Sequence, residues 1–177
     1  MFKKMKKLGL FVLFICFGLS LSAQKFAAVD KSPLDVAILR ADRNAKPILK
    51  IYYSRPQLNG RELSTLVPTG QVWRLGANEA TELVLNQSIT IGGSKLAPGT
   101  YTLYAVPAVD AWTIVISKDT DVWGSYSYKE ANDVVRVKAS TMAANDSIEA
   151  FSIDCNYADK AIYMGWGKTI AKLPISL

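Results

Sequence analysis

The residues with the greatest capacity for chemistry gather in one irregular stretch, between residues 52 and 82. This stretch holds three arginines beside asparagine, glutamate and tryptophan, and it is punctuated by glycine and proline. Guanidinium groups form paired hydrogen bonds with carboxylate, phosphate or sulfate, and a neighbouring aromatic ring can stack on a sugar. Loops on a rigid scaffold commonly carry such sites. The residues expected to form a ligand-binding or structural cluster are Arg55, Arg61, Trp73, Arg74, Asn78 and Glu79.

The same residues also fit a purely structural network that ties a long loop to its scaffold. Charges that are buried must pair, because a single buried charge is costly to desolvate. We therefore expect Arg74 and Glu79 to lie within ion-pair distance of each other, or of Arg55 or Arg61. A buried, fully paired cluster would indicate a structural role, which we expect for Arg74. An open cleft with carboxylates and unpaired arginine would indicate ligand binding or hydrolysis, and we expect Arg55 and Arg61 to face the ligand.

The composition excludes several kinds of catalytic chemistry. The chain contains no histidine, which removes Ser-His-Asp and Cys-His catalysis and histidine-ligated zinc. Cys155 has no histidine to activate it and is expected to be a packing residue. No metal site and no cofactor are expected. A hydrolase would have to rely on carboxylates, and those available are Glu79, Glu82, Asp119, Asp121 and Asp133.

The amino terminus has the layout of a secretory signal peptide. Four lysines precede an apolar run over residues 8–21, and Ser22-Ala23 then offers a cleavage site before Gln24. The run is shorter than the roughly 20 residues of a membrane span. Cleavage removes four of the 21 basic residues and none of the 15 acidic ones, so the net charge falls from +6 to +2. We expect an exported periplasmic or extracellular protein with no membrane span in the mature chain and no nucleic-acid partner.

The positioning elements are predicted to be strands. Short runs rich in Val, Ile, Thr and Tyr recur between Gly, Pro, Asn and Asp, which is typical of an all-β protein. The pattern predicts an antiparallel β-sandwich, jelly-roll-like, of about eight to ten strands, in one domain over residues 24–177. A short helical turn is expected at 61–67. The predicted strands are 34–41, 47–54, 81–86, 88–91, 100–106, 111–117, 133–139, 147–155, 160–166 and 169–176.

Alternation along two of these strands predicts part of the core. Residues two apart on a strand share a face. The expected buried residues, on neighbouring antiparallel strands, are Tyr101, Leu103, Trp112, Ile114 and Ile116. Gly92-Gly93 is expected to turn a hairpin. The Tyr101 hydroxyl, two residues after a turn glycine, is expected to bond to nearby backbone.

Several motifs together resemble one protein family. They are YSRP (53–56), NGR (59–61), LVP-x-x-QVWRLGANEAT (66–81), LAPGTY (96–101), WGSYSY (123–128) and DVVRV (133–137). In these motifs the chain is similar to the domain-of-unknown-function family 2911, secreted bacterial proteins with no established activity. The resemblance implies an all-β sandwich in the envelope of a Gram-negative bacterium. It implies no catalytic residues, since the family has none assigned.

Three functions are compatible with these observations. The first is a non-catalytic binding module for a small anionic or carbohydrate ligand. The second is a carboxylate-dependent hydrolase acting on envelope or imported polysaccharide. The third is a structural accessory protein of an envelope assembly. The sequence identifies neither the ligand nor any protein partner.

Overall fold

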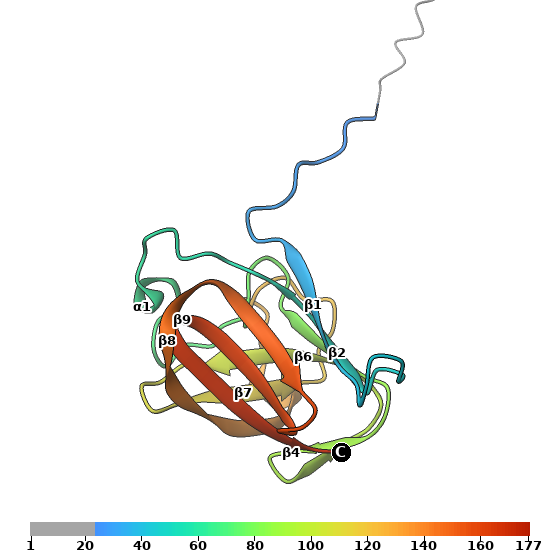
Figure 1. Cartoon of the computed structure of the whole chain (residues 1–177). Helices are drawn as coiled ribbons and strands as arrows, with labels where there is room; N and C mark the ends of the chain where they lie inside the picture. Colours follow the sequence, from blue (N-terminus) through green and yellow to red (C-terminus); the bar gives the residue numbers. More distant parts are fainter. Residues whose placement is uncertain (1–23) are drawn as a thin grey trace, which may run out of the picture.

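The computed structural model describes residues 24–177, in which nine strands form one continuous antiparallel sheet (Figure 1). The order across the sheet is β1-β2-β3-β6-β7-β8-β9-β4-β5. The predicted signal peptide, residues 1–23, lies outside the described residues. The strands are β1 (Leu34–Leu39), β2 (Leu49–Ser54), β3 (Thr81–Leu85), β4 (Ile89–Ile91), β5 (Ser94–Leu96), β6 (Gly99–Val106), β7 (Ala111–Ser117), β8 (Asp133–Asn156) and β9 (Ala161–Ser176).

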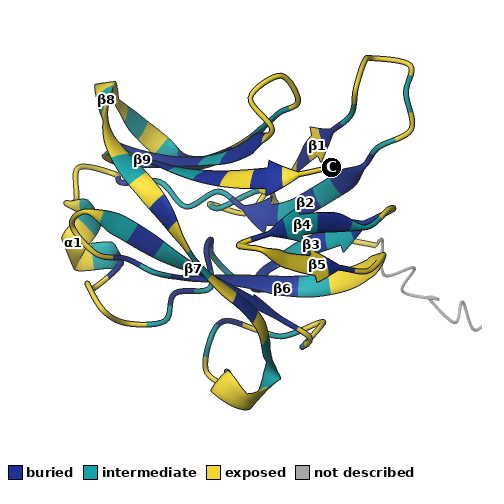
Figure 2. Cartoon of the chain, turned by 90° about the horizontal axis from the view of Figure 1, so that it is seen from below, coloured by how far each residue is buried: buried dark blue, intermediate teal, exposed yellow. Residues whose placement is uncertain are grey.

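The predicted all-β class is confirmed, but the sandwich subtype is not, because all the strands join one sheet. This sheet curls, so that β8 and β9 pass across the strands that precede them (Figures 1 and 2). Tyr53 on β2 packs edge-on against Phe151 on β8, with ring centroids 5.7 Å apart. The curl lets one face of a single sheet enclose the core that two sheets would enclose in a sandwich.

The sequence divides β8 and β9 into four strands, whereas the structure has two long ones. The predicted strands leave breaks at residues 140–146 and 167–168. In the structure, β8 instead bulges away from β9: Ala143 lies opposite Thr169, but the next partner pair is Ile148 and Gly167. Bulges bend a strand without ending it, and this one contributes to the curl of the sheet.

The predicted core pairing of β6 with β7 is confirmed. Leu103 lies opposite Ile116, and Leu103, Trp112, Ile114 and Ile116 are all at most 3% exposed. Tyr101 is only partly buried, so the prediction that it belongs to the core is confirmed in part. Its hydroxyl donates to the Ala97 carbonyl at 3.0 Å, as expected for a tyrosine that closes a corner.

Two smaller predictions are also confirmed. Gly92 and Gly93, with φ of 58° and 80°, turn the β4–β5 hairpin. Positive φ at both turn positions matches the right-handed twist of the strands, and glycine adopts it without strain. The expected helical turn is present as α1 (Leu63–Leu66). Among residues 24–177, no helix has the length and apolar character needed to cross a membrane.

Candidate functional site

The six residues predicted to form a cluster are divided among four places in the structure. Arg55 lies where β1, β2 and β8 meet. Its Nη1 is 3.1 Å from Asp35 Oδ2, its Nε donates to the Phe151 carbonyl at 3.1 Å, and its Nη2 donates to Ser152 Oγ at 2.8 Å. Each guanidinium nitrogen therefore has a partner within the protein. These contacts give Arg55 a structural role in holding the curled sheet together, so it is not the unpaired arginine expected of a ligand site.

Arg61 lies in the loop that leads into α1. Its Nε and Nη2 donate to the carbonyls of Leu58 and Gln57, at 2.8 and 2.9 Å. These acceptors are three and four residues away, so Arg61 stabilises its own loop. Arg61 is exposed at the protein surface and makes no ion pair with the described residues.

Trp73 and Arg74 are adjacent in sequence but have opposite surroundings. Trp73 is 9% exposed and stacks on Trp166, with ring centroids 5.6 Å apart. The Arg74 guanidinium lies over the Tyr126 ring, 5.8 Å from its centroid. Successive side chains of an extended segment point to opposite sides, so Trp73 enters the core while Arg74 remains at the surface.

The predicted ion pair of Arg74 with Glu79 is wrong. Among the residues that the structure describes, the ion pairs are Arg55 with Asp35 and Arg136 with Asp133. Arg74 Nη1 donates instead to the Asn78 carbonyl at 3.2 Å. A carbonyl acceptor and an aromatic face together satisfy a guanidinium that remains partly exposed, so no carboxylate is required.

The segment from Leu75 to Ala80 is a loop whose carbonyls are bound by nearby side chains. The Trp73 indole donates to the Gly76 carbonyl at 3.0 Å, and the Thr81 hydroxyl donates to the Leu75 carbonyl at 2.6 Å. With the Arg74 bond to Asn78, three side chains bind three carbonyls of this loop and hold its backbone in place. A Cβ at Gly76 would lie 3.0 Å from the Ser54 carbonyl oxygen, so only glycine fits there without displacing β2.

This rigid loop presents Asn78 and Glu79 to a cleft of about 580 Å³, here called the acidic cleft. The cleft lies on the outer side of β1, β2 and β3, facing the 118–132 loop. Two of its non-glycine residues, Asn78 and Asp121, have positive φ, at 59° and 55°. Such backbone is uncommon outside glycine and is often found at functional sites. The polar and aromatic lining consists of Asp30, Ser32, Tyr52, Tyr53, Ser54, Asn78, Glu79, Glu82, Asp121 and Trp123.

Two carboxylates of the acidic cleft, those of Glu82 and Asp30, are held by neutral donors. Glu82 Oε1 accepts the Asp121 backbone N–H at 2.9 Å. Asp30 Oδ1 accepts the Ser32 N–H at 2.7 Å and the Asn78 side-chain amide at 3.2 Å. These two hydrogen bonds, the backbone one foremost, hold the pKa of Asp30 below its ordinary value. The Glu79 carboxylate makes no hydrogen bond or ion pair with the described residues, so it is free to meet a ligand.

Aromatic rings line the same cleft. Trp123 is 59% exposed, although most of a tryptophan side chain is usually buried. A backbone bridge between Glu79 and Trp123 fixes the tryptophan beside the free carboxylate. Tyr52 lies on the neighbouring wall, and its cross-strand partner on β3 is Glu82. The cleft therefore combines flat apolar surfaces with carboxylate and amide groups, a combination suited to a polyhydroxylated ligand.

The sequence analysis assigned Asn78 and Glu79 to the site but did not include Asp30, Tyr52 or Trp123. Glu82 and Asp121 were named as carboxylates available to a hydrolase, without a partner. The close spacing of Asp121 and Trp123 in the sequence could have indicated that their loop forms one wall of the cleft. Asp119, two residues earlier, faces elsewhere: it accepts from Asn132 and Ser117.

Comparisons with known proteins identify the family but no activity. The family described as "Protein of unknown function (DUF2911)" matches residues 36–175. No curated protein and no solved structure matches the chain. The match covers every strand of the sheet at least in part, from β1 to β9, together with all of the acidic cleft except its amino-terminal residues. The chain therefore belongs to the DUF2911 family of proteins of unknown function.

Proposed function

We propose that this protein is an exported, non-catalytic binding module that holds a carbohydrate in the acidic cleft. Trp123 carries the proposal, because it is an exposed ring beside the free carboxylate of Glu79. One face of a sugar ring is apolar and can stack on the indole, while its hydroxyl groups donate to carboxylates. Tyr52 adds a second aromatic ring to the cleft, and Asn78 adds an amide group that can form hydrogen bonds with sugar hydroxyls.

The charge of the lining favours a carbohydrate over an anion. None of the described residues that line the acidic cleft is a lysine or an arginine. Four carboxylates line it, those of Asp30, Glu79, Glu82 and Asp121. An anionic ligand would be repelled here, since like charges in close proximity are unfavourable. The arginines on which an anion site was predicted make their hydrogen bonds within the protein.

A carboxylate-dependent hydrolase is the second candidate, because one observation favours it. Glu79, Glu82 and Asp121, three of the five carboxylates named from the sequence, line a single cleft. Glycoside hydrolysis needs two carboxylates on opposite sides of the scissile bond, one as acid and one as base or nucleophile. Glu82 is engaged with the Asp121 backbone, whereas the carboxylates of Glu79 and Asp121 make no hydrogen bond with the described residues, so these two are the candidates for acid and base.

Calorimetric titration with a panel of neutral oligosaccharides tests the proposal. We expect at least one to bind the wild-type protein, and Trp123→Ala to weaken binding about tenfold or more, the scale of a lost aromatic contact. Tyr157→Ala is the control, because Tyr157 is also an exposed aromatic residue, at 42%, and lies outside the cleft lining. Both variants should unfold within about 0.5 kcal/mol of wild type.

Three outcomes would separate the candidates. Binding without release of reducing ends supports the binding module. Release of reducing ends that Glu79→Gln abolishes would replace it with the hydrolase. Failure of every oligosaccharide to bind, or equal binding by Trp123→Ala and wild type, would refute the carbohydrate proposal and leave the structural accessory role.

A further inference from the structure

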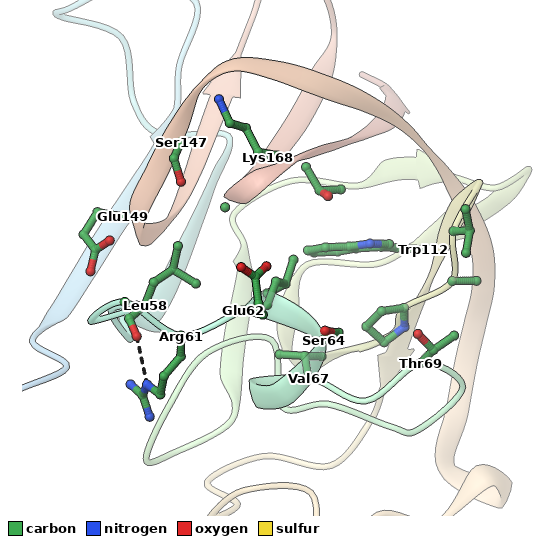
Figure 3. Close-up of a pocket in the computed structure, with 17 residues that line it drawn as sticks. Leu58, Arg61, Glu62, Ser64, Val67, Thr69, Trp112, Ser147, Glu149 and Lys168 are labelled. Carbon is green, nitrogen blue, oxygen red and sulfur yellow. Dashed lines mark hydrogen bonds between the residues drawn. The ribbon is translucent and has the colours of Figure 1, made fainter.

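A second cavity, of about 690 Å³, opens at α1 (Figure 3). We call it the amphipathic pocket. Its floor is apolar and includes Leu58, Val67 and Trp112, whereas its mouth carries charged side chains. The walls come from the α1 loop, the β6–β7 turn and the bulged part of β8 with β9. A small organic ligand fits a cavity of this size and lining.

Trp112 provides an unused hydrogen-bond donor in the floor. The ring is only 3% exposed, yet its indole N–H has no acceptor among residues 24–177. Trp73 and Trp166, by contrast, donate their indole N–H to the carbonyls of Gly76 and Glu149. Among the described residues, the fully enclosed side-chain polar atoms without a partner are Tyr104 Oη and Asp133 Oδ1. The Trp112 nitrogen is therefore not fully enclosed. Trp112 also lines the amphipathic pocket, so a ligand held there lies against this ring.

Glu62 provides an unused acceptor at the mouth. Figure 3 shows its carboxylate directed toward the space beside Trp112. Glu62 is the N-cap residue of α1, but its side chain makes no capping hydrogen bond. It also makes no ion pair with any described residue. A carboxylate with neither role is available to a ligand cation.

The other charged groups around the pocket are already engaged. Arg61 donates to two carbonyls of its own loop, and Figure 3 shows its guanidinium pointing away from the cavity. Lys168 donates to the Asn145 carbonyl at 3.1 Å, across the β8 bulge. Glu149 Oε1 accepts the Asn59 N–H at 2.7 Å. Among the charged side chains that line the pocket, Glu62 is therefore the one that makes no hydrogen bond or ion pair with the described residues.

We propose that the amphipathic pocket binds a small organic amine with an apolar body and a hydrogen-bond acceptor. The ammonium group pairs with Glu62, the apolar body covers Leu58 and Val67, and the acceptor receives the Trp112 indole N–H. This site is separate from the acidic cleft, shares no lining residue with it and does not depend on the proposed carbohydrate function.

Three aromatic probes of similar size test the charge preference by calorimetric titration. Phenylethanolamine is cationic, phenylethylene glycol is neutral and mandelate is anionic, and all three carry a phenyl ring and a hydroxyl group. We expect phenylethanolamine to bind most tightly and Glu62→Gln to weaken its binding about fivefold to tenfold, the range of one partly exposed charged hydrogen bond. Glu149→Gln, the same charge change at an engaged carboxylate, should weaken it less than about twofold.

The Trp112 indole N–H gives a readout that requires no substitution in the core. In a proton–nitrogen correlation spectrum of the wild-type protein, phenylethanolamine should shift the Trp112 indole resonance and leave that of Trp123 unchanged. Tighter binding of mandelate would overturn the proposal and assign the pocket to Lys168 and Arg61. Equal binding of all three probes, no binding of any, or a shift of Trp123 without Trp112 would also overturn it.

Discussion

Replacing Arg55 with alanine should destabilise the protein by about 2.5 kcal/mol. The ion pair with Asp35 contributes little of this, at most about 0.5 kcal/mol, because the two side chains are 35% and 43% exposed. The bonds to the Phe151 carbonyl and to Ser152 contribute more, about 1 kcal/mol each, since they are charge-assisted and partly buried. They also join segments almost a hundred residues apart, where the sheet curls onto itself.

Urea titration followed by circular dichroism measures this loss, with the slope m checked for constancy. Arg61→Ala is the control, because Arg61 also makes two carbonyl hydrogen bonds, but within its own exposed loop. It should cost less than about 1 kcal/mol. Asp35→Asn removes the charge and keeps one acceptor oxygen, and it should cost about 0.5 kcal/mol, the scale of an exposed ion pair. If Arg55→Ala costs no more than Arg61→Ala, the junction of β1, β2 and β8 does not depend on this guanidinium.

Three further measurements test other parts of the account. The exported protein should begin at Gln24, and an intact mass that retains residues 1–23 would contradict the proposed signal peptide. Burial raises the pKa of the Cys155 thiol to about 12, so iodoacetamide should label the folded protein slowly and the urea-unfolded protein rapidly at about pH 8; equal rates would show that the thiol is accessible. Burial, together with the hydrogen bond to the Asp133 carboxylate, raises the pKa of Tyr128 to about 12. Because unfolded tyrosine titrates near pH 10, the folded state holds more protons between about pH 10 and 12, so stability should fall as the pH rises through that window. Tyr128→Phe should make the fall shallower, and an unchanged slope would assign the effect to other tyrosines.

The strands were largely predictable, because alternation and turn residues are local signals. The β6–β7 pair and the Gly92-Gly93 hairpin needed no information beyond their own segments. The length of β8 was not predictable in the same way. Polar residues such as Asn145 and Asp146 occur in turns and in bulges alike, and only pairing with β9 decides between them.

The candidate site was less predictable, because it depends on contacts between distant segments. Proximity in sequence suggested that Arg74 and Glu79 pair, but the intervening loop turns the guanidinium toward Asn78 and Tyr126. The carboxylate that pairs with Arg55 is Asp35, twenty residues earlier, on a strand that becomes its neighbour only in the folded sheet.

The acidic cleft is likewise assembled from four separated segments, residues 30–34, 52–54, 78–82 and 121–123. Local patterns identified the 78–82 segment, since its motif combines an amide and a carboxylate. They could not show that the 118–132 loop folds over it, because that contact depends on backbone hydrogen bonds such as Ala80 N–H to the Val122 carbonyl.

The indole resonances of the four tryptophans offer the most direct test of carbohydrate binding in the acidic cleft. Trp123 lines that cleft, Trp112 lines the amphipathic pocket, and Trp73 and Trp166 are buried in the core. A proton–nitrogen correlation spectrum is recorded while the tightest-binding neutral oligosaccharide is added. We predict that the Trp123 resonance shifts saturably and that the other three do not move. A saturable shift of Trp112 alone, or saturation of binding with no change at Trp123, would contradict the assignment of the carbohydrate to this cleft.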